Sequence, residues 1–381
     1  MNKSIIEFIR DQYGTKEKIP LHEPLFTKDE YKLVSECIDT TFVSSTGPFV
    51  NKFENLISNY TGSQAVIATT NGTSALHTSL ILAGVCRDDL VITQSFTFVA
   101  TCNAIEYCGA SPILLDIDVD TLGLSPAAVK GWLEENGFID SAGLCRHKKT
   151  NRVIRACLPM HTFGHPCHLD DLIELCGKWN LALVEDAAES LGSFYRGKHT
   201  GTFGVAGAIS FNGNKIITTG GGGAVLTSGL LGGLAKHITT TAKLSDDYFH
   251  DQVGFNYRLP NLNAALGCAQ IAKLHSIVSA KRRLASNYIN FFNNTRYKPF
   301  LEPQGSTSNY WLNSIVCEDR AERDQLCKYL NKSGIMARSP WILMGNLPMY
   351  ETSLRDSQKN AVYFCERILN LPSTAPGCFL T

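Results

Sequence analysis

The residues between Gln64 and Leu226 alternate between short β-branched runs and segments with helical spacing. Strands are predicted over residues 65–68, 90–92, 112–116, 154–159, 181–184, 208–211 and 224–226. Helices are predicted over residues 74–83, 98–107 and 125–135. In the last of these, Ser125 suits the N-cap and Pro126 the first helical position. Such alternation is typical of a largely parallel sheet with helices on both faces, so the sequence predicts an α/β domain.

After Asn261 this alternation stops. The pattern predicts a long helix over residues 263–285, a strand over 311–316, a helix over 320–331 and a terminal helix near 360–369. We expect a smaller C-terminal α+β domain here. The chain then divides into an N-terminal helical segment (1–18), a large α/β domain (19–275) and the small domain (276–381).

Composition excludes several classes of protein. Among 381 residues, 44% are hydrophobic, which suffices for a sizeable core. The 35 basic residues equal the 35 acidic ones, so no basic excess favours nucleic acid or a membrane surface. Thirteen cysteines without a Cys-x-x-Cys pair indicate reduced thiols in the cytoplasm.

No segment is expected to target or cross a membrane. Residues 1–14 carry charges throughout, unlike a signal peptide. The stretch from Ile216 to Ala235 has no charge and is long enough to span a bilayer. Its Gly220–Gly223 run instead favours a turn followed by a strand.

Three predicted strands end in residues that could carry chemistry, and ligands of open α/β sheets bind beyond such ends. The first end is Thr69 to Ser74, where an Asn71-Gly72 turn leads into a helix. Free backbone N–H groups and hydroxyls at a helix N-terminus form an anion site. The alternative is that Thr73 or Ser74 only caps the helix.

The second end is Val184 to Glu189, where an apolar strand delivers carboxylates. Asp186 there could bind a metal, hold a ribose or pair with a protonated pyridine nitrogen. A glycosidase-like pair of carboxylates, or helix capping by Asp186, fits the same residues.

The third end places Lys215 in a loop after the strand ending at Phe211, ahead of the glycine run. A lysine amine can form a Schiff base, and glycines allow a planar ligand to approach closely. The spacing is neither a P-loop nor a dinucleotide fingerprint. An exposed surface lysine is the alternative.

An anion cradle, a carboxylate and a lysine at successive strand ends match one cofactor. Pyridoxal 5′-phosphate (PLP) needs a phosphate site, an acid at its ring nitrogen and a lysine at its aldehyde. The combination therefore predicts a PLP enzyme.

The sequence also resembles the sugar-nucleotide aminotransferases of the DegT family, which have the aspartate-aminotransferase fold (fold type I). The resemblance runs from Ile19-Pro20-Leu21 to Leu371-Pro372-Ser373. The motifs that carry it lie at residues 71–76, 95–100, 184–189, 256–259 and 263–265, together with Ser210, Phe211 and Lys215. It implies a large mixed, mostly parallel sheet domain, a smaller C-terminal α+β domain and PLP-dependent transamination.

The resemblance also implies roles for single residues. Lys215 would form the Schiff base and shuttle the proton, and Asp186 would pair with the pyridinium nitrogen. Glu189 would lie near the phenolic oxygen, and Phe98 would stack on the ring. The phosphate would be held by Gly72, Thr73, Ser74 and Ser210. Asn256 or Arg258 would reach the cofactor of a neighbouring subunit in a homodimer.

A narrower resemblance concerns the substrate. The runs at residues 159–166, 211–219 and 239–243 are similar to enzymes that aminate UDP-linked 4-keto-6-deoxy-N-acetylhexosamines for legionaminic acid and related surface sugars, including lipopolysaccharide. It implies a UDP-2-acetamido-4-keto sugar as acceptor and glutamate as donor; a GDP-linked sugar is the alternative. Residues that could shape the sugar pocket are His161, His165, Tyr310, Trp311 and Trp341, for which ordinary packing is equally open.

Three competing hypotheses make distinct predictions. The cluster of His161, His165, Cys167 and His168 could bind zinc, but it lacks a second ligand pair, so we expect a polar loop and no metal. A nicotinamide-dependent oxidoreductase requires a Gly-x-Gly-x-x-Gly motif, which is missing after the first strand. A non-catalytic regulator on the same fold should have lost Lys215 or Asp186, and both are present.

Overall fold

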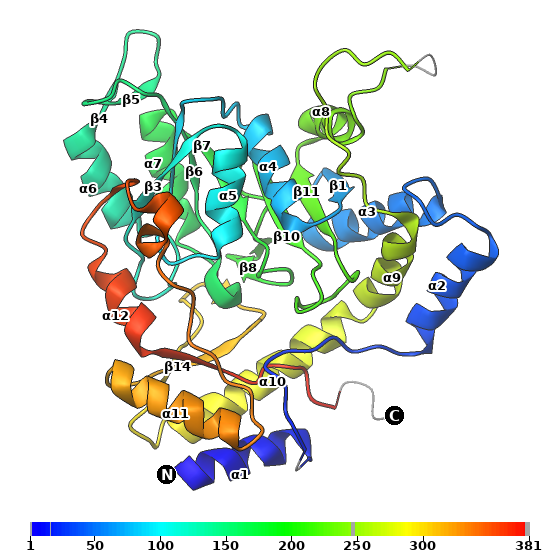
Figure 1. The fold of residues 1–381 in the computed structure, drawn as a ribbon, viewed down its shortest axis with the longest axis vertical. Helices are drawn as coiled ribbons and strands as arrows, with labels where there is room; N and C mark the ends of the chain where they lie inside the picture. The colour runs from blue at the N-terminus through cyan, green and yellow to red at the C-terminus, as the bar shows by residue number, and fades with distance from the viewer. Residues whose placement is uncertain (1, 16, 245–247, 378–381) are drawn as a thin grey trace.

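The computed structural model describes residues 2–15, 17–244 and 248–377. A large sheet sandwiched by helices forms the upper part of the molecule in Figure 1. A smaller part built around the long helix α10 (Leu274–Phe292) lies below it.

The large sheet has eight strands in the order β1-β11-β10-β7-β6-β2-β3-β15. Only β11 runs antiparallel to its neighbours, and every other pairing in the sheet is parallel. The strands are β1 (Ala65–Thr69), β2 (Leu90–Gln94), β3 (Ser111–Leu115), β6 (Ile154–Leu158), β7 (Ala182–Asp186), β10 (Ala206–Ser210), β11 (Gly223–Thr227) and β15 (Leu354–Arg355). The predicted mixed, mostly parallel sheet is confirmed.

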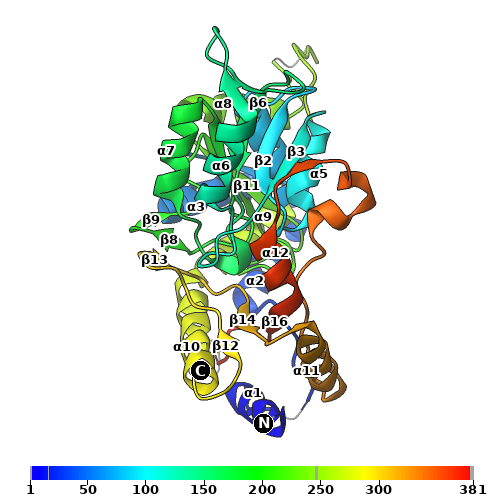
Figure 2. The same cartoon turned by 90° about the vertical axis from the view of Figure 1, so that its left-hand side faces the viewer.

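Helices cover both faces of this sheet because its strands are apolar on both sides. Successive residues of β2 illustrate this: Ile92 packs with α6 and α7, whereas Val91 packs with α4 and α5. Figure 2 shows α6 and α7 on one side of the sheet and α5 on the other. The helices of this part are α3 (Pro48–Thr61), α4 (Gly72–Leu82), α5 (Val99–Tyr107), α6 (Pro126–Asn136), α7 (Leu169–Trp179) and α8 (Gly229–Thr239).

Capping residues in the sequence predicted the first residues of the helices to within a few positions of where the helices begin. Ser125 caps α6 as predicted, accepting a hydrogen bond from Ala128 N at 3.3 Å. Helix α4 starts two residues earlier than predicted, at Gly72. Asn71, rather than Thr73 or Ser74, is its N-cap and accepts from Ser74 N at 2.8 Å.

The predicted long helix over residues 263–285 is wrong, because the chain forms two helices there. Helix α9 (Asn261–Ile271) packs against α2 (Lys28–Asp39) and α3, and α10 then leaves in a new direction. At the junction, Lys273 binds Glu30 of α2 at 2.7 Å, which fixes the break. Both residues of the junction, Ala272 and Lys273, are good helix formers, so the sequence pattern does not reveal it.

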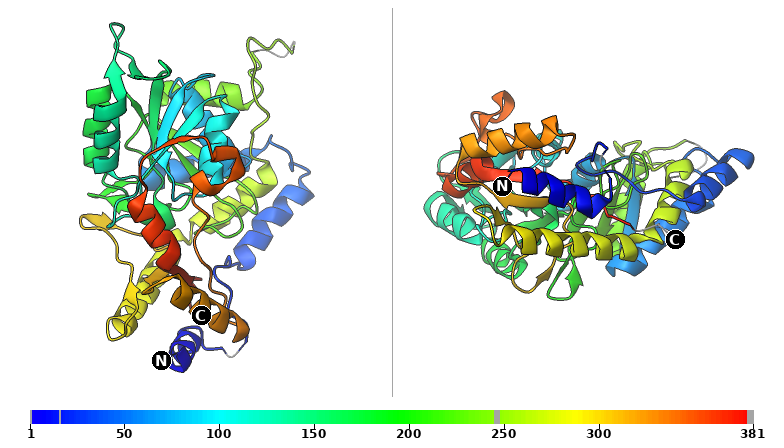
Figure 3. Two further views of the ribbon diagram at one scale, coloured as in Figure 1. Left: turned by 60° about the vertical axis from the view of Figure 1, so that its left-hand side comes forward. Right: turned by 90° about the horizontal axis from the view of Figure 1, so that it is seen from below.

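The smaller part has its own core, formed by α1 (Asn2–Tyr13), α10, α11 (Arg320–Lys332) and a three-stranded sheet. Figure 3 shows α1, α10 and α11 together at this end of the molecule. The sheet contains β12 (Lys298–Pro299), β14 (Asn313–Val316) and β16 (Ile368–Leu371) in the order β12-β14-β16. The predicted terminal helix is α12 (Lys359–Arg367), which ends earlier than expected because β16 follows it directly.

The chain crosses between the two parts more than once. The predicted boundary at residue 275 falls in the first turn of α10. Strand β15 returns to pair with β3 of the large sheet, and Ile19 forms a bridge with Ile335. The smaller elements are β4 (Gly137–Ile139), β5 (Cys145–His147), β8 (Phe194–Tyr195), β9 (Lys198–His199), β13 (Ser306–Thr307), η1 (Thr162–Gly164), η2 (Met344–Asn346) and η3 (Pro348–Tyr350).

Within the described residues, no helix has the length and apolar character needed to cross a membrane. The uncharged stretch from Ile216 to Ala235 forms a turn, β11 and part of α8, as the glycine run predicted. The twelve described cysteines are free thiols.

Phe53 of α3 provides a direct test of this core. It is fully buried and makes an edge-on contact with Phe211, the residue after β10, at 5.0 Å between ring centroids. We expect Phe53→Ala to lower the free energy of unfolding by about 3–5 kcal/mol, because it leaves a cavity. The exposed Phe26 is the matched control, and Phe26→Ala should change little in the same denaturant titration. Equal stability of the two variants would contradict this packing.

Candidate active site

The three strand ends singled out in the sequence meet at one edge of the sheet. Strands β1 and β10 both run antiparallel to β11, so they are parallel to each other, and β7 is parallel to β10. Their carboxyl ends therefore lie at the same edge of the sheet, with β11 between β1 and β10. A cavity of about 440 Å³ opens there, with Asp186 and Lys215 on its large-domain wall and Trp311 and Arg338 on its small-domain wall.

Asp186 is the last residue of β7 and is 2% exposed. Its carboxylate accepts hydrogen bonds from the Thr101 hydroxyl at 2.7 Å and from Ala188 N at 3.1 Å. Burial raises its pKa above the ordinary value, and these two bonds and the Lys215 ammonium oppose the rise. Within the described residues no cation lies in direct contact with this carboxylate, so it suits a ligand that brings a positive charge.

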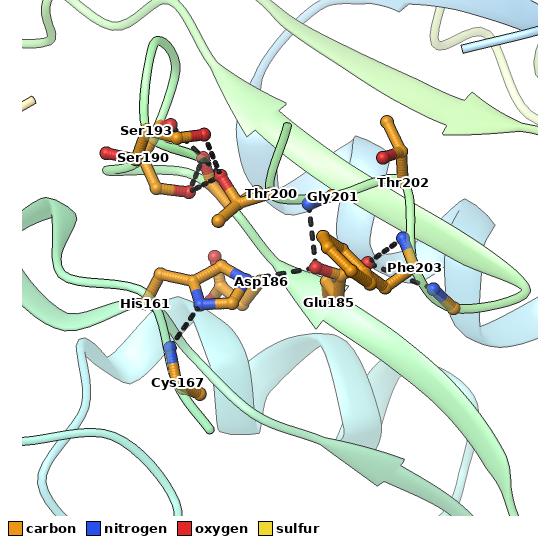
Figure 4. A network of polar contacts seen from close by, with 12 residues as sticks. His161, Cys167, Glu185, Asp186, Ser190, Ser193, Thr200, Gly201, Thr202 and Phe203 are labelled. Atoms are coloured by element: carbon orange, nitrogen blue, oxygen red, sulfur yellow. Dashed lines mark hydrogen bonds and ion pairs between the residues drawn. The ribbon is translucent and has the colours of Figure 1, made fainter. Parts of the chain in front are cut away.

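Glu185, the preceding residue, serves the scaffold. Its carboxylate accepts from His161 Nε2 at 3.1 Å and from the backbone N–H groups of Gly201, Phe203 and Gly204 at 2.7, 2.6 and 3.0 Å (Figure 4). Burial alone would raise the pKa of Glu185, but the bonds from His161 and the backbone lower it below its ordinary value. Glu185 is thus a buried anion that holds the 201–204 turn in place.

The side chains of Lys215 and Glu189 are in contact at the wall of the cavity. The ammonium Nζ lies 3.2 Å from Glu189 Oε1 and 4.0 Å from the centroid of the Trp311 ring. Glu189 is buried and also accepts from Phe163 N at 2.9 Å. Burial raises the pKa of Glu189 to about 7, although the Lys215 ammonium opposes this. Glu189 can therefore gain or lose a proton near neutral pH beside the amine of Lys215.

The N-terminus of α4 closes against β10 at the same edge. A Cβ on Gly72 would lie 2.8 Å from Ser210 Cβ, so only glycine allows this approach. Because the first-turn N–H groups of a helix lack intrahelical partners, the site attracts an anion. Of the four predicted phosphate ligands, Gly72, Thr73 and Ser210 line the cavity, and Ser74 lies behind them with its hydroxyl 3.3 Å from that of Thr70.

The structure brings most predicted residues together. Phe98 lines the cavity and is 48% exposed as a residue, and its stacking on a cofactor stays a prediction. Asn256 and Arg258 are exposed and lie outside the cavity lining of this chain. Arg258 forms a bridge with Thr69 at the end of β1.

Two of the five candidates for the sugar pocket line the cavity, Trp311 and Trp341. For His161, His165 and Tyr310 the structure favours the alternative of ordinary packing, because these side chains are buried and lie outside the cavity lining. His161 is fully buried and bonds Glu185 and Cys167 N. His165 packs between Phe300 and Tyr310, and the Tyr310 hydroxyl accepts from Glu302 N at 3.1 Å.

The members of the predicted cluster of His161, His165, Cys167 and His168 have separate partners in the structure. Because Cys167 N donates to His161 Nδ1, the proton of this ring resides on Nε2 and faces Glu185. His168 instead pairs with Asp118 at 3.3 Å, and Asp120 lies close by. The Asp118 carboxylate also accepts from Asp120 N at 2.9 Å.

The sequence analysis missed three residues that contribute to the cavity or hold one of its acids. Thr101 follows the recognised 95–100 motif by one residue, so its position after that motif was the available signal. His22 directly follows Ile19-Pro20-Leu21, where the resemblance begins. Arg338 comes from a segment with no chemical signal of its own, and only the fold brings it to the cavity.

The residues present fit PLP. Gly72, Thr73 and Ser210 would hold its phosphate, and Asp186 would take its protonated ring nitrogen. Lys215 lies where an amine is needed for its aldehyde, beside Glu189. Together the fold and the site define a PLP-dependent aminotransferase.

Comparison with known proteins identifies the family. Residues 24–376 match the DegT/DnrJ/EryC1/StrS aminotransferase family, and the chain belongs to it. The resemblance predicted from the sequence is thereby confirmed at the level of the family, the cofactor PLP and the aminotransferase class.

Three relatives illustrate the similarity. A GDP-perosamine synthase of Escherichia coli O157:H7 is 35% identical over 342 residues, covering 87% of each chain. A Bacillus subtilis protein named as a pyridoxal phosphate-dependent aminotransferase, EpsN, is 33% identical and covers 92% of this chain and 88% of its own. The crystal structure of a family member from Brucella abortus superposes with a TM-score of 0.82 at 26% identity, covering 93% and 91%.

Thr101 provides a test of how Asp186 is held. We expect Thr101→Val to weaken PLP binding about tenfold, because it removes a hydrogen bond to a charged carboxylate. Thr101→Ser keeps the hydroxyl and should bind PLP nearly as the native protein does. Fluorescence titration of protein stripped of cofactor measures both. Native affinity in the valine variant would contradict the assigned contact.

The raised pKa of Glu189 predicts a pH dependence of stability. Between its ordinary value near 4.5 and about 7, the unfolded chain has lost this proton and the folded chain retains it. Protein stripped of cofactor should therefore lose stability, relative to Glu189→Gln, by up to about 1.4 kcal/mol per pH unit as pH rises through this window. Urea titrations at several pH values measure this difference. A difference that does not vary with pH would show that Glu189 titrates as it does in the unfolded chain.

Proposed function

We propose that this enzyme transfers an amino group from glutamate to the ketone of a nucleotide-linked 4-keto-6-deoxy sugar. The geometry that supports it best is Lys215 and Glu189 in contact at 3.2 Å, at the sheet edge where Asp186 ends β7. The proposed acceptor is UDP-2-acetamido-2,6-dideoxy-hexos-4-ulose, supported by the runs at residues 159–166, 211–219 and 239–243. The product would serve surface polysaccharide or nonulosonic acid synthesis in the cytoplasm.

The chain's own residues divide the chemistry between them. When bound, PLP supplies an electron sink that stabilises negative charge at the carbon losing its proton. Lys215 removes the proton from the α-carbon of glutamate and later returns a proton to the sugar carbon. Glu189 lies beside the amine of Lys215, and its own pKa of about 7 lets it take up or release a proton there near neutral pH. Asp186 keeps a negative charge buried where the ring nitrogen must stay protonated.

The aromatic walls of the cavity would exclude water from these steps. Trp311 lies under the Lys215 ammonium and donates from Nε1 to Asn214 O at 2.7 Å, which ties the small domain to the lysine loop. Trp341 packs on Phe163 and faces Phe98. Apolar surroundings strengthen the electrostatic contacts of the buried acids.

A second acceptor has support of its own. The E. coli relative is named as a GDP-perosamine synthase, which favours a GDP-linked keto sugar. The reaction, the donor and the roles of Lys215 and Asp186 are the same in both cases, so only the nucleotide and the substituents of the sugar differ.

We also propose that the enzyme acts as a homodimer. Asn256 and Arg258 are exposed and lie outside the cavity of their own chain, beside the end of β1. This position would suit contact with the cofactor phosphate of a neighbouring copy. Arg258→Ala should then lower the affinity for PLP and leave the melting temperature nearly unchanged, whereas unchanged affinity would contradict the shared site.

The acceptor can be decided by a competition assay. We expect the purified enzyme with PLP and glutamate to aminate the UDP-linked keto sugar with a higher kcat/KM than the GDP-linked one. Mass spectrometry of the amino-sugar products measures both rates in one mixture. A preference for the GDP sugar would overturn the UDP assignment, and no product from either would contradict sugar transamination.

Lys215 can be tested by removal. Lys215→Ala should still bind PLP through the remaining contacts but lose turnover by at least about a thousandfold, because it removes the amine that moves the proton. Lys52, exposed on α3, is the matched control, and Lys52→Ala should keep native rates. Substantial turnover by Lys215→Ala would refute the role of this lysine.

A further inference from the structure

Two polar groups of the cavity have no part in the chemistry described above. His22 and Arg338 both line it, on the wall that the small domain contributes. They come from segments joined by backbone contacts: Met336 N donates to Ile19 O at 2.9 Å, and Ile19 forms a bridge with Ile335. The two residues therefore belong to one continuous wall facing Lys215.

His22 is held firmly but makes no side-chain hydrogen bond within the described residues. The backbone on either side of it is fixed, because Ser373 N donates to Leu21 O at 2.7 Å and Glu23 N donates to the Thr374 hydroxyl at 3.0 Å. Its Nδ1 is buried without a partner among those residues. Burial and the ammonium groups of Lys281 and Lys215 lower the pKa of His22 well below its ordinary value, so the ring is neutral and offers one N–H donor.

Arg338 brings a positive charge to the same wall. Its backbone pairs with Asn370, with N···O distances of 3.1 and 2.9 Å. Its guanidinium forms no hydrogen bond or ion pair in the part of the chain that the structure describes. The acids of the cavity, Asp186 and Glu189, are held by Thr101 and Lys215. Arg338 is exposed to solvent where it lines the cavity, so its guanidinium is free to pair with an anion that has two oxygens in one plane.

We propose that Arg338 and His22 bind the carboxylate attached to the α-carbon of the amino donor, Arg338 as the cation and His22 as an additional N–H donor. This assignment rests on the proposed function. It makes the two residues substrate-positioning groups that act in the first half of the reaction.

The donor fits this wall better than the diphosphate of the sugar nucleotide does. The α-carboxylate is bonded directly to the carbon that gives up its proton to Lys215, so it must lie inside the same cavity. The diphosphate is attached on the far side of the sugar ring from the reacting ketone, and so must lie farther from Lys215. A cationic group in the wall facing Lys215 is therefore placed for the carboxylate.

The two halves of the reaction can be measured separately, which allows a sharp test. Native enzyme loaded with PLP is mixed with glutamate, and the change in cofactor absorbance is followed against glutamate concentration. The aminated enzyme is then mixed with the keto sugar, and the reverse change is followed. We expect Arg338→Met and His22→Phe to raise the half-saturating glutamate concentration about tenfold or more, since each removes a bond to a charged group. The sugar half should change little.

Binding without turnover provides a second readout. Glutarate is a dicarboxylate that lacks the amino group, and calorimetry of the loaded enzyme should show its affinity falling by a similar factor in both variants. Arg338→Lys should recover only part of it, because an ammonium lacks the planar fork. His22→Asn, which keeps an N–H donor, should lose less than His22→Phe. Matched controls are Arg320→Met and His275→Phe, at exposed positions of α11 and α10.

Each outcome decides a different point. Loss confined to the sugar half would assign this wall to the diphosphate and overturn the proposal. Equal loss in both halves, with an altered melting temperature, would show a structural role and also overturn it, as would unchanged glutamate and glutarate binding. Failure of the native enzyme itself to respond to glutamate would instead count against the proposed function.

Discussion

The site depends on two neighbouring carboxylates at the end of β7 that point to opposite faces of the sheet. Asp186 faces the cavity and, among the described residues, accepts hydrogen bonds from one hydroxyl and one backbone N–H. Glu185 faces the scaffold and accepts four N–H groups. The two-residue period of a strand imposes this division. One acid stabilises the surrounding turn, and the other is left available for a positively charged ligand. A shift of one residue in the register of β7 would turn each side chain to the opposite face of the sheet, and neither carboxylate would keep its present partners.

The remaining chemistry follows from where the strands end. Because β1, β7 and β10 are parallel to one another, their carboxyl ends bring the N-terminus of α4, Asp186 and the Lys215 loop to one edge. The small domain closes that edge with Trp311, Trp341, His22 and Arg338. Burial there costs free energy for any charge, which explains the raised pKa of Glu189 and its contact with Lys215. The same burial strengthens the electrostatic contacts that these acids can make with a charged cofactor.

The sequence predicted the large sheet, its helices and the central site residues, because each depended on a local signal. Apolar runs identified the strands, and Asp186 and Lys215 stood at strand ends. The features that the sequence did not predict depend on contacts between residues that are distant along the chain. The helix break at Lys273 depends on Glu30 of a distant helix, and the burial of His161 depends on Glu185. His165 and Tyr310 lay near recognised motifs, but packing directs them away from the cavity. Arg338 reaches the cavity only because its segment pairs with Ile19 and Asn370.

The central claim is that Lys215 is the lysine that joins the cofactor. Borohydride reduction of the enzyme loaded with PLP, followed by digestion and peptide mass spectrometry, tests it directly. The account predicts a cofactor-sized mass increase on the peptide that contains Lys215, and none on the peptide with Lys281, a fully buried lysine whose charge also acts on His22. Modification of a different lysine, or of none, would contradict it.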